Sequence, residues 1–125
     1  MRRKRAGGPQ HDNRRQRFPR ARQGASPLQV EALARIEATS PHRPIMLREV
    51  LRTLQPRPGD VVVDATLGGG GHAEALLAHV GPGGRLIGLD VDTLELPRTE
   101  ARLRAAGYGP EVCRAVQASF ADMAA

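Results

Sequence analysis

Apolar residues in the first half of the chain recur at helical spacing in two segments. Residues 26–38 open with Ser-Pro-Leu-Gln, in which Ser26 and Gln29 can form a capping box and proline suits the first helical position. The segment 45–54 has four apolar residues at positions i, i+3, i+4 and i+7 of one helix face: Leu47, Val50, Leu51 and Leu54. We therefore expect two helices before residue 55.

From residue 61 the pattern changes to short apolar runs that are separated by glycine-rich turns. The segment 61–65 opens with three consecutive β-branched residues, Val61 to Val63, and predicts a strand that is buried on both faces. The runs over 85–90 and 111–117 predict two more strands, and helices are expected between them over 73–80 and 94–106. Strands and helices that alternate in this way indicate an α/β fold with a parallel sheet.

Composition narrows the class of protein. The chain has 125 residues, of which 40% are hydrophobic but only three are aromatic, so we expect a core of Ala, Val, Leu and Ile. The single cysteine, Cys113, excludes an internal disulfide and a multi-cysteine zinc site, and we expect its thiol in the core or at an interface. No apolar run approaches the ~18 residues of a membrane span, and no signal-peptide stretch follows the basic N-terminus. We expect a cytoplasmic protein without a membrane partner.

The net charge of +6 belongs to the N-terminal segment. Residues 1–22 hold nine of the 19 Lys and Arg residues and a single acid, Asp12, whereas 23–125 hold 10 basic and 12 acidic residues. The segment has few apolar residues to bury, so we expect a disordered basic tail over 1–25 and a folded domain over 26–125. Such a tail can contact RNA phosphates, although a solvated tail without specific recognition is the simpler interpretation.

The glycine-rich segment after the first predicted strand is the candidate ligand site. Four consecutive glycines, Gly68 to Gly71, precede His72, and without β-carbons they let a ligand lie against the main chain at a helix start. Ligands of open α/β sheets bind at the carboxyl ends of strands. Asp90 ends the next predicted strand, 20 residues after Gly70, which is the usual distance for an acid that accepts hydrogen bonds from a ribose diol.

Asp64 favours S-adenosylmethionine over a dinucleotide as the ligand. A carboxylate placed ahead of the glycines can face the ammonium group of that cofactor, but it would repel a pyrophosphate. Asp64 can also hydrogen-bond the glycine-rich segment itself, and the two roles are compatible. A P-loop is excluded because no Gly-Lys-Ser/Thr follows the glycines. From these residues alone, an NAD-binding Rossmann enzyme and a non-catalytic RNA-binding fragment remain alternatives.

Four segments resemble motifs of the bacterial ribosomal RNA small-subunit methyltransferase H family. Residues 41–51 are similar to its H-x-P-V-L-L-x-E-V opening, and residues 63–72 resemble its D-x-T-x-G-x-G-G-H cofactor loop. Residues 89–92 match its D-x-D strand end, and Ser119-Phe120 matches a later phenylalanine. The resemblance covers about residues 41–122 and is more specific than a generic glycine motif.

The resemblance implies a class I methyltransferase (Rossmann-like) fold that uses S-adenosylmethionine. It implies methyl transfer to the 4-amino group of a cytidine in small-subunit (16S) ribosomal RNA, with that RNA or a ribosomal particle as the partner. The residues that it implies as cofactor contacts, beside Asp64 and Gly68, are Gly70, Gly71, His72, Asp90 at the ribose and Phe120 near the adenine.

Simpler interpretations exist for two of these residues and for the chain as a whole. His72 could be only a helix-start residue, and Phe120 an apolar plug under the sheet edge. The family continues well beyond the matched segments, so we expect residues 26–125 to be the N-terminal half of a methyltransferase domain, inactive by itself. The missing half would hold the target base, and for this reason no catalytic residue is assigned.

Overall fold

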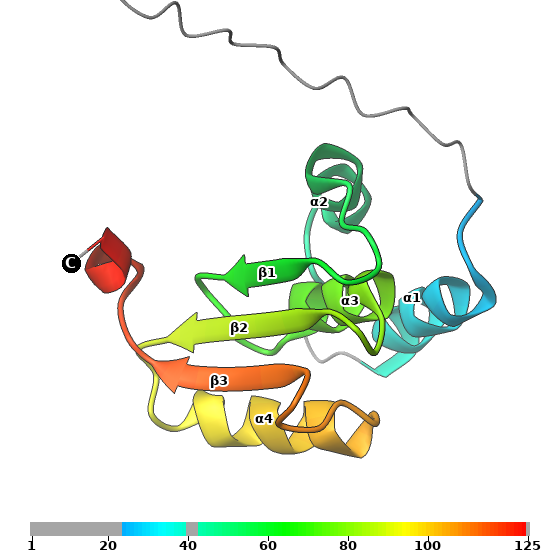
Figure 1. Cartoon of the computed structure of the whole chain (residues 1–125). Coiled ribbons are helices and arrows are strands. Elements are labelled where there is room, and N and C mark those ends of the chain that lie inside the picture. Colours follow the sequence, from blue (N-terminus) through cyan, green and yellow to red (C-terminus); the bar gives the residue numbers. More distant parts are fainter. Residues whose placement is uncertain (1–23, 40–42, 125) are drawn as a thin grey trace, which may run out of the picture.

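The elements follow one another in the predicted order. The computed structural model describes residues 24–39 and 43–124, so residues 1–23 of the predicted tail and residues 41–42 of the opening motif lie outside the described residues. The elements are α1 (Pro27–Thr39), α2 (Leu47–Leu54), β1 (Val61–Asp64), α3 (Gly71–Val80), β2 (Arg85–Asp90), α4 (Glu95–Ala105), β3 (Cys113–Gln117) and the 3-10 helix η1 (Phe120–Ala124) (Figure 1).

The three strands form a parallel sheet in the order β1-β2-β3. In register, Val62 lies beside Leu86, and Leu86 lies beside Cys113. All three strands run toward the same edge of the sheet, where η1 also lies (Figure 1). The predicted α/β fold with a parallel sheet is confirmed, and this topology brings the residues that follow each strand to one edge.

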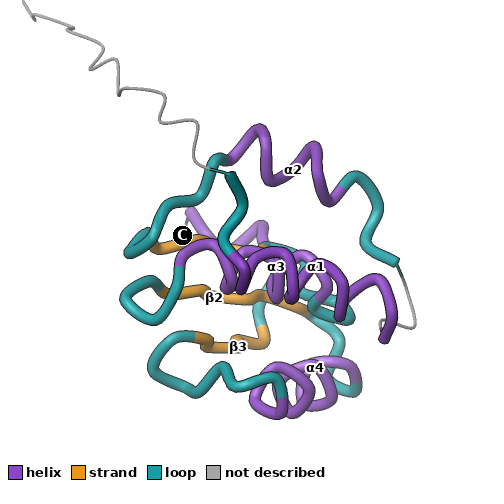
Figure 2. Tube along the Cα trace, turned by 90° about the vertical axis from the view of Figure 1, so that its right-hand side faces the viewer, coloured by secondary structure: helices purple, strands orange, loops and turns teal. Residues whose placement is uncertain are grey.

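Helices α3 and α4 cover the same face of the sheet (Figure 2). Leu86 and Cys113, which are register partners, belong to one buried cluster with Leu77 of α3 and Leu103 of α4. A second cluster joins the two N-terminal helices to α3, and its buried members are Ile36, Leu47 and Ala75. The core is therefore aliphatic, as predicted, and the Cys113 thiol lies within it.

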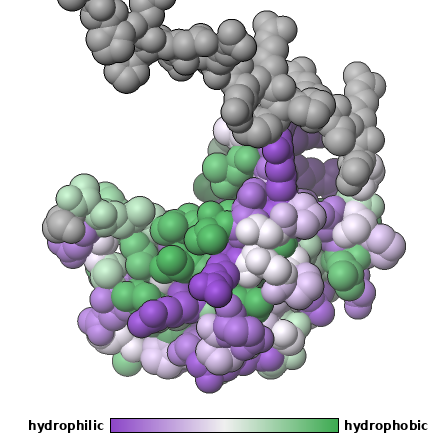
Figure 3. All heavy atoms as spheres, viewed as in Figure 1, coloured by the Kyte–Doolittle hydropathy of each residue, from purple (hydrophilic) through white to green (hydrophobic). Residues whose placement is uncertain are grey.

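The other face of β1 is exposed, and the prediction of a strand buried on both faces is wrong. Val61 is 64% exposed and Val63 is 46% exposed, while Val62 packs against the core. The cause is that α3 and α4 both lie on the opposite side, and no element of the described part covers this one. Apolar side chains gather over the sheet face shown in Figure 3.

Local hydrogen bonds explain where several elements begin. The predicted capping box is present at α1, because the Ser26 amide donates to Gln29 Oε1 at 2.8 Å and the Gln29 amide donates to Ser26 Oγ at 3.3 Å. Strand β3 begins at Cys113, two residues later than predicted, because a turn precedes it in which the Cys113 amide donates to the Gly109 carbonyl at 2.9 Å. Within the described ranges, no helix is long and apolar enough to cross a membrane.

Candidate cofactor-binding site

A cavity of about 230 Å³ opens at the carboxyl ends of the strands. Its wall comes from the segments that follow β1, β2 and β3, and the lining residues are Ala65, Thr66, Asp90, Val91, Ala118, Ser119 and Phe120. The structure thus brings Asp90 and Phe120 together, although they are 30 residues apart in the sequence. Phe120 is 63% exposed, so the interpretation of this side chain as a plug under the sheet edge is wrong.

Asp64, the last residue of β1, has one carboxylate oxygen bonded and one without a partner. Its Oδ1 accepts a hydrogen bond from the Thr66 amide at 3.1 Å, so its role in holding the following loop is confirmed. Its Oδ2 is buried and has no hydrogen-bond partner within the described residues. A buried acceptor without a partner costs free energy, about 1–3 kcal/mol and more for a charged group. This oxygen is therefore suited to receive a donor from a ligand.

Asp90 connects the loops that follow β1 and β2. Its Oδ2 accepts the Gly68 amide at 2.7 Å, and its Oδ1 accepts the Asp92 amide at 2.9 Å. Each carboxylate oxygen has two lone pairs, so both can accept a further hydrogen bond from a ligand hydroxyl. The Asp90 carboxylate therefore fixes the shape of the cavity wall and retains acceptor capacity within it.

Asp92 caps the following helix, α4. Its Oδ1 accepts the Leu94 amide at 2.8 Å and the Glu95 amide at 3.0 Å. These backbone hydrogen bonds, first the one from Glu95, lower the pKa of the Asp92 carboxyl. The second acid of the D-x-D strand end thus starts α4, while the first faces the site.

The four glycines fall into two pairs with different surroundings. A β-carbon on Gly68 or Gly69 would meet no side chain within 4 Å, whereas one on Gly70 would lie 2.7 Å from Thr99 Cγ2. A β-carbon on Gly71 would lie 2.9 Å from Cγ of Pro44. The sequence suggested that all four leave room for a ligand. In the structure, close packing inside the protein already requires glycine at 70 and 71.

His72, the second residue of α3, contacts the segment that precedes α2. Its Nε2 lies 2.9 Å from the Ile45 carbonyl oxygen, which requires the hydrogen to be on that nitrogen. The packing of Gly71 against Pro44 occurs at the same junction. The described parts of the opening motif and of the glycine motif therefore meet in space.

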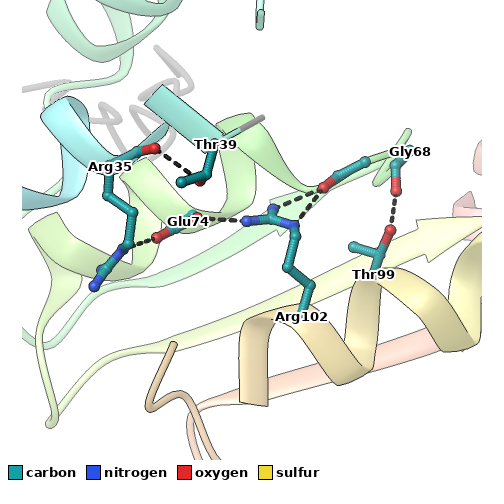
Figure 4. Close-up of polar contacts among 7 residues, drawn as sticks. Arg35, Thr39, Gly68, Glu74, Thr99 and Arg102 are labelled. Atoms are coloured by element: carbon teal, nitrogen blue, oxygen red, sulfur yellow. Dashed lines mark hydrogen bonds and ion pairs between the residues drawn. The ribbon is translucent and has the colours of Figure 1, made fainter. Parts of the chain in front are cut away.

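Sequence reasoning missed three residues that hold the glycine loop, which we define as residues 65–70. Thr99 and Arg102 of α4 bond the carbonyl oxygens of Gly68 and Gly69, and buried Glu74 of α3 pairs with Arg102 (Figure 4). The sequence does contain one indication of this network, which is Glu74 inside the apolar stretch 73–80. A charged side chain that is buried there requires a partner of opposite charge. In the described ranges no group of three or more His, Cys, Asp and Glu residues could hold a metal ion.

Comparison with known sequences decides the family. The model of the MraW methylase family matches residues 39–125. The chain belongs to the MraW methylase family. Among the relatives of this chain, the ribosomal RNA small subunit methyltransferase H of Rubrobacter xylanophilus is 53% identical over 66 residues, which cover 53% of this chain and 21% of that protein. The protein of the same name from Trichlorobacter lovleyi is 46% identical over 83 residues, which cover 66% and 26%. The matched part of this chain thus spans about a quarter of the length of these relatives.

Solved structures show the same fold as this chain. A SAM-dependent O-methyltransferase from Thermotoga maritima superposes with a TM-score of 0.62 at 18% identity, and the match covers 73% of this chain and 35% of that one. A candidate rRNA-methylase from Clostridium thermocellum gives a TM-score of 0.57 at 25% identity, covering 62% and 44%. The Rossmann-like methyltransferase fold implied by the sequence is therefore confirmed.

Proposed function

We propose that this chain carries the S-adenosylmethionine-binding part of a methyltransferase. The observation that supports this most directly is the buried Oδ2 of Asp64 at the carboxyl end of β1, for which the described residues supply no hydrogen-bond donor. An ammonium group bound there would supply the missing donor, directly or through water, and would neutralise the carboxylate. The pyrophosphate of NAD would place negative charge against the same oxygen, which argues against the dinucleotide alternative.

Each predicted site residue has a role in holding the cofactor. Asp64 would accept from the ammonium group, Asp90 would accept from the ribose hydroxyls, and Phe120 would pack on the adenine. The residues that would line the methionine side are Gly68, Gly70, Gly71 and His72. When bound, S-adenosylmethionine supplies an electrophilic methyl group on a sulfonium. The chain's own contribution is to orient that group and to exclude water from it.

We propose that the target is the 4-amino group of a cytidine in small-subunit (16S) ribosomal RNA, within the cytoplasm. Membership of the family supports this target, as do relatives that are named ribosomal RNA small subunit methyltransferase H. The amino nitrogen of cytosine is a poor nucleophile, so its alignment with the methyl group provides much of the rate. We propose that residues 26–125 supply the cofactor side of that alignment and do not by themselves hold the target base.

Equilibrium binding to the full chain tests the choice of cofactor. We expect S-adenosylmethionine to bind, and Asp64→Asn to weaken it by about tenfold, because the amide loses the charge that pairs with the ammonium. Asp60→Asn is the matched control. Asp60 accepts the Arg57 amide at 2.8 Å and precedes β1, at the end of the strand away from the cavity. Binding of NAD without binding of S-adenosylmethionine would overturn the proposal.

Methylation of small-subunit particles tests the target. We expect this chain alone to transfer no methyl group, and a version extended to the length of its relatives to methylate a cytidine 4-amino group.

Deletion of residues 1–22 should weaken RNA binding and flatten its salt dependence, since nine cations are removed. Unchanged affinity and salt dependence after this deletion would exclude an RNA-binding role of the basic tail.

A further inference from the structure

Two side chains of α4 hold the carbonyl oxygens of the glycine loop. Thr99 Oγ1 donates to the Gly68 carbonyl at 2.5 Å. The Arg102 guanidinium donates twice to the Gly69 carbonyl, from Nε at 3.1 Å and from Nη2 at 2.7 Å. Figure 4 shows both side chains reaching from α4 to consecutive residues of the loop. Neither side chain belongs to the predicted cofactor contacts.

Fixing these two carbonyls also fixes the amide groups that follow them. The described residues contain no cis peptide bond, and in a planar trans peptide the N–H points opposite to the preceding C=O. The bond from Thr99 therefore turns the Gly69 N–H away from α4. The peptide between Gly69 and Gly70 is held at both ends, because the Gly70 amide donates to the Leu67 carbonyl at 2.8 Å.

Glu74 determines where the Arg102 side chain lies. The Glu74 side chain is 0% exposed, and its Oε2 accepts from Arg102 Nη1 at 2.6 Å. Its other oxygen accepts from Arg35 Nε of α1 at 2.7 Å. The guanidinium of Arg102 is thus committed on one side to Glu74 and on the other to the loop, which leaves it little rotational freedom.

From this geometry we propose that Thr99 and Arg102 are positioning residues for the cofactor, and that Glu74 acts through Arg102. They hold the carbonyl oxygens of Gly68 and Gly69 toward α4, so that the loop presents the Gly69 amide and the bare α-carbons of Gly68 and Gly69 to the ligand. The inference rests on the proposed function of S-adenosylmethionine binding. It adds residues of a helix outside the glycine motif to those that determine the affinity for the cofactor.

Binding of S-adenosylmethionine to variants of the full chain is the first test. We expect Thr99→Val, which replaces the hydroxyl with a methyl group, and Arg102→Met to weaken binding by about tenfold. Thr99→Ser keeps the hydroxyl, so its affinity for S-adenosylmethionine should stay within about twofold of that of the unsubstituted chain. Arg104→Met is the matched control, since Arg104 lies on the same helix and bonds Glu100 at 2.7 Å on the surface.

Amide hydrogen exchange in the ligand-free chain is the second test, and it does not depend on the cofactor. The Gly68 and Gly70 amides are hydrogen-bonded to Asp90 and Leu67, so their exchange reports the order of the loop. We expect Thr99→Val and Arg102→Met to speed this exchange by about tenfold, while core amides of β2 stay protected.

The two tests separate failure of the inference from failure of the proposed function. Faster loop exchange in a chain that does not bind S-adenosylmethionine would support the positioning of the loop and contradict the proposed cofactor. Normal cofactor binding by Thr99→Val and Arg102→Met would overturn the inference and leave the proposed function intact. Unchanged exchange of the loop amides in both variants would also overturn the inference. Loss of protection throughout β2 would overturn it as well, because it would show that Thr99 and Arg102 stabilise the whole fold and not the loop in particular.

Discussion

Replacing Glu74 with glutamine measures how much the buried ion pairs contribute to stability. The carboxylate is fully buried and accepts from Arg35 at 2.7 Å and from Arg102 at 2.6 Å. Hydrogen bonds to charged groups contribute about 1.5–3 kcal/mol each, and breaking a buried pair costs about 3–5 kcal/mol. Glutamine keeps the size and one acceptor, and the side chains of Arg35 and Arg102 are 39% and 30% exposed, so water can hydrate them. We expect the free energy of unfolding to fall by about 2–3 kcal/mol.

Urea denaturation followed by circular dichroism gives this difference directly. The matched control is Glu100→Gln, because Glu100 also accepts from an arginine at 2.7 Å but lies on the surface of α4, paired at i,i+4 with Arg104. Exposed pairs of this kind contribute about 0.3–0.5 kcal/mol. The two substitutions change the same chemical group at nearly the same distance, so burial is the variable that separates them.

A small effect at the buried site would refute the reasoning. If Glu74→Gln and Glu100→Gln lowered the free energy of unfolding equally, the network would contribute no more than a surface pair. Double-mutant cycles that combine Glu74→Gln with Arg35→Met or with Arg102→Met measure the coupling free energy between Glu74 and each arginine. We expect the larger coupling with Arg102, the less exposed of the two arginines.

Three further predictions concern the loop, the cap of α4 and the core thiol. Gly70→Ala should lower the free energy of unfolding by about 2 kcal/mol or more, because φ is +78° and the new β-carbon would lie 2.7 Å from the Thr99 methyl; in urea denaturation, Gly69→Ala, with open space around it, should have little effect. The lowered pKa of Asp92 contributes stability that is complete above about pH 4 and is lost as the pH falls through the folded-state pKa; acid titrations should show a smaller loss in Asp92→Asn, and equal losses would contradict the cap. Burial raises the pKa of the Cys113 thiol, so iodoacetamide at pH 8 should react slowly with the native chain and rapidly in urea; equal rates would show that the thiol is accessible.

The order of the elements could be predicted because the spacing of apolar residues changes from helical to strand-like at residue 61. The burial of β1 could not be predicted from the sequence. A run of valines is compatible both with a strand covered on one face and with a strand covered on both faces. Val61 and Val63 are exposed because α3 and α4 take the same side of the sheet. Tertiary packing determines which side of the sheet the helices cover, and a local sequence pattern does not contain this information.

The part of the site that was predictable lies directly after the strands. Asp64 and Asp90 are the last residues of β1 and β2, and Phe120 follows β3. Parallel strands bring these ends to one edge of the sheet. Thr99 and Arg102 could not be found in this way. They lie 31 and 33 residues from the carbonyls that they bond, and only the packing of α4 beside α3 brings them to the loop.

The separation in sequence between the glycine loop and α4 has a consequence for the order of folding. The segment from β1 to α3 contains every glycine of the loop, yet the hydrogen bonds that orient two of its carbonyls come from a helix that begins at Glu95. Closing a connection of about 30 residues costs entropy before these contacts can form. We therefore expect the loop to reach its final shape late, after β2 and α4 have docked, and a ligand that binds the finished loop to stabilise that docking by mass action.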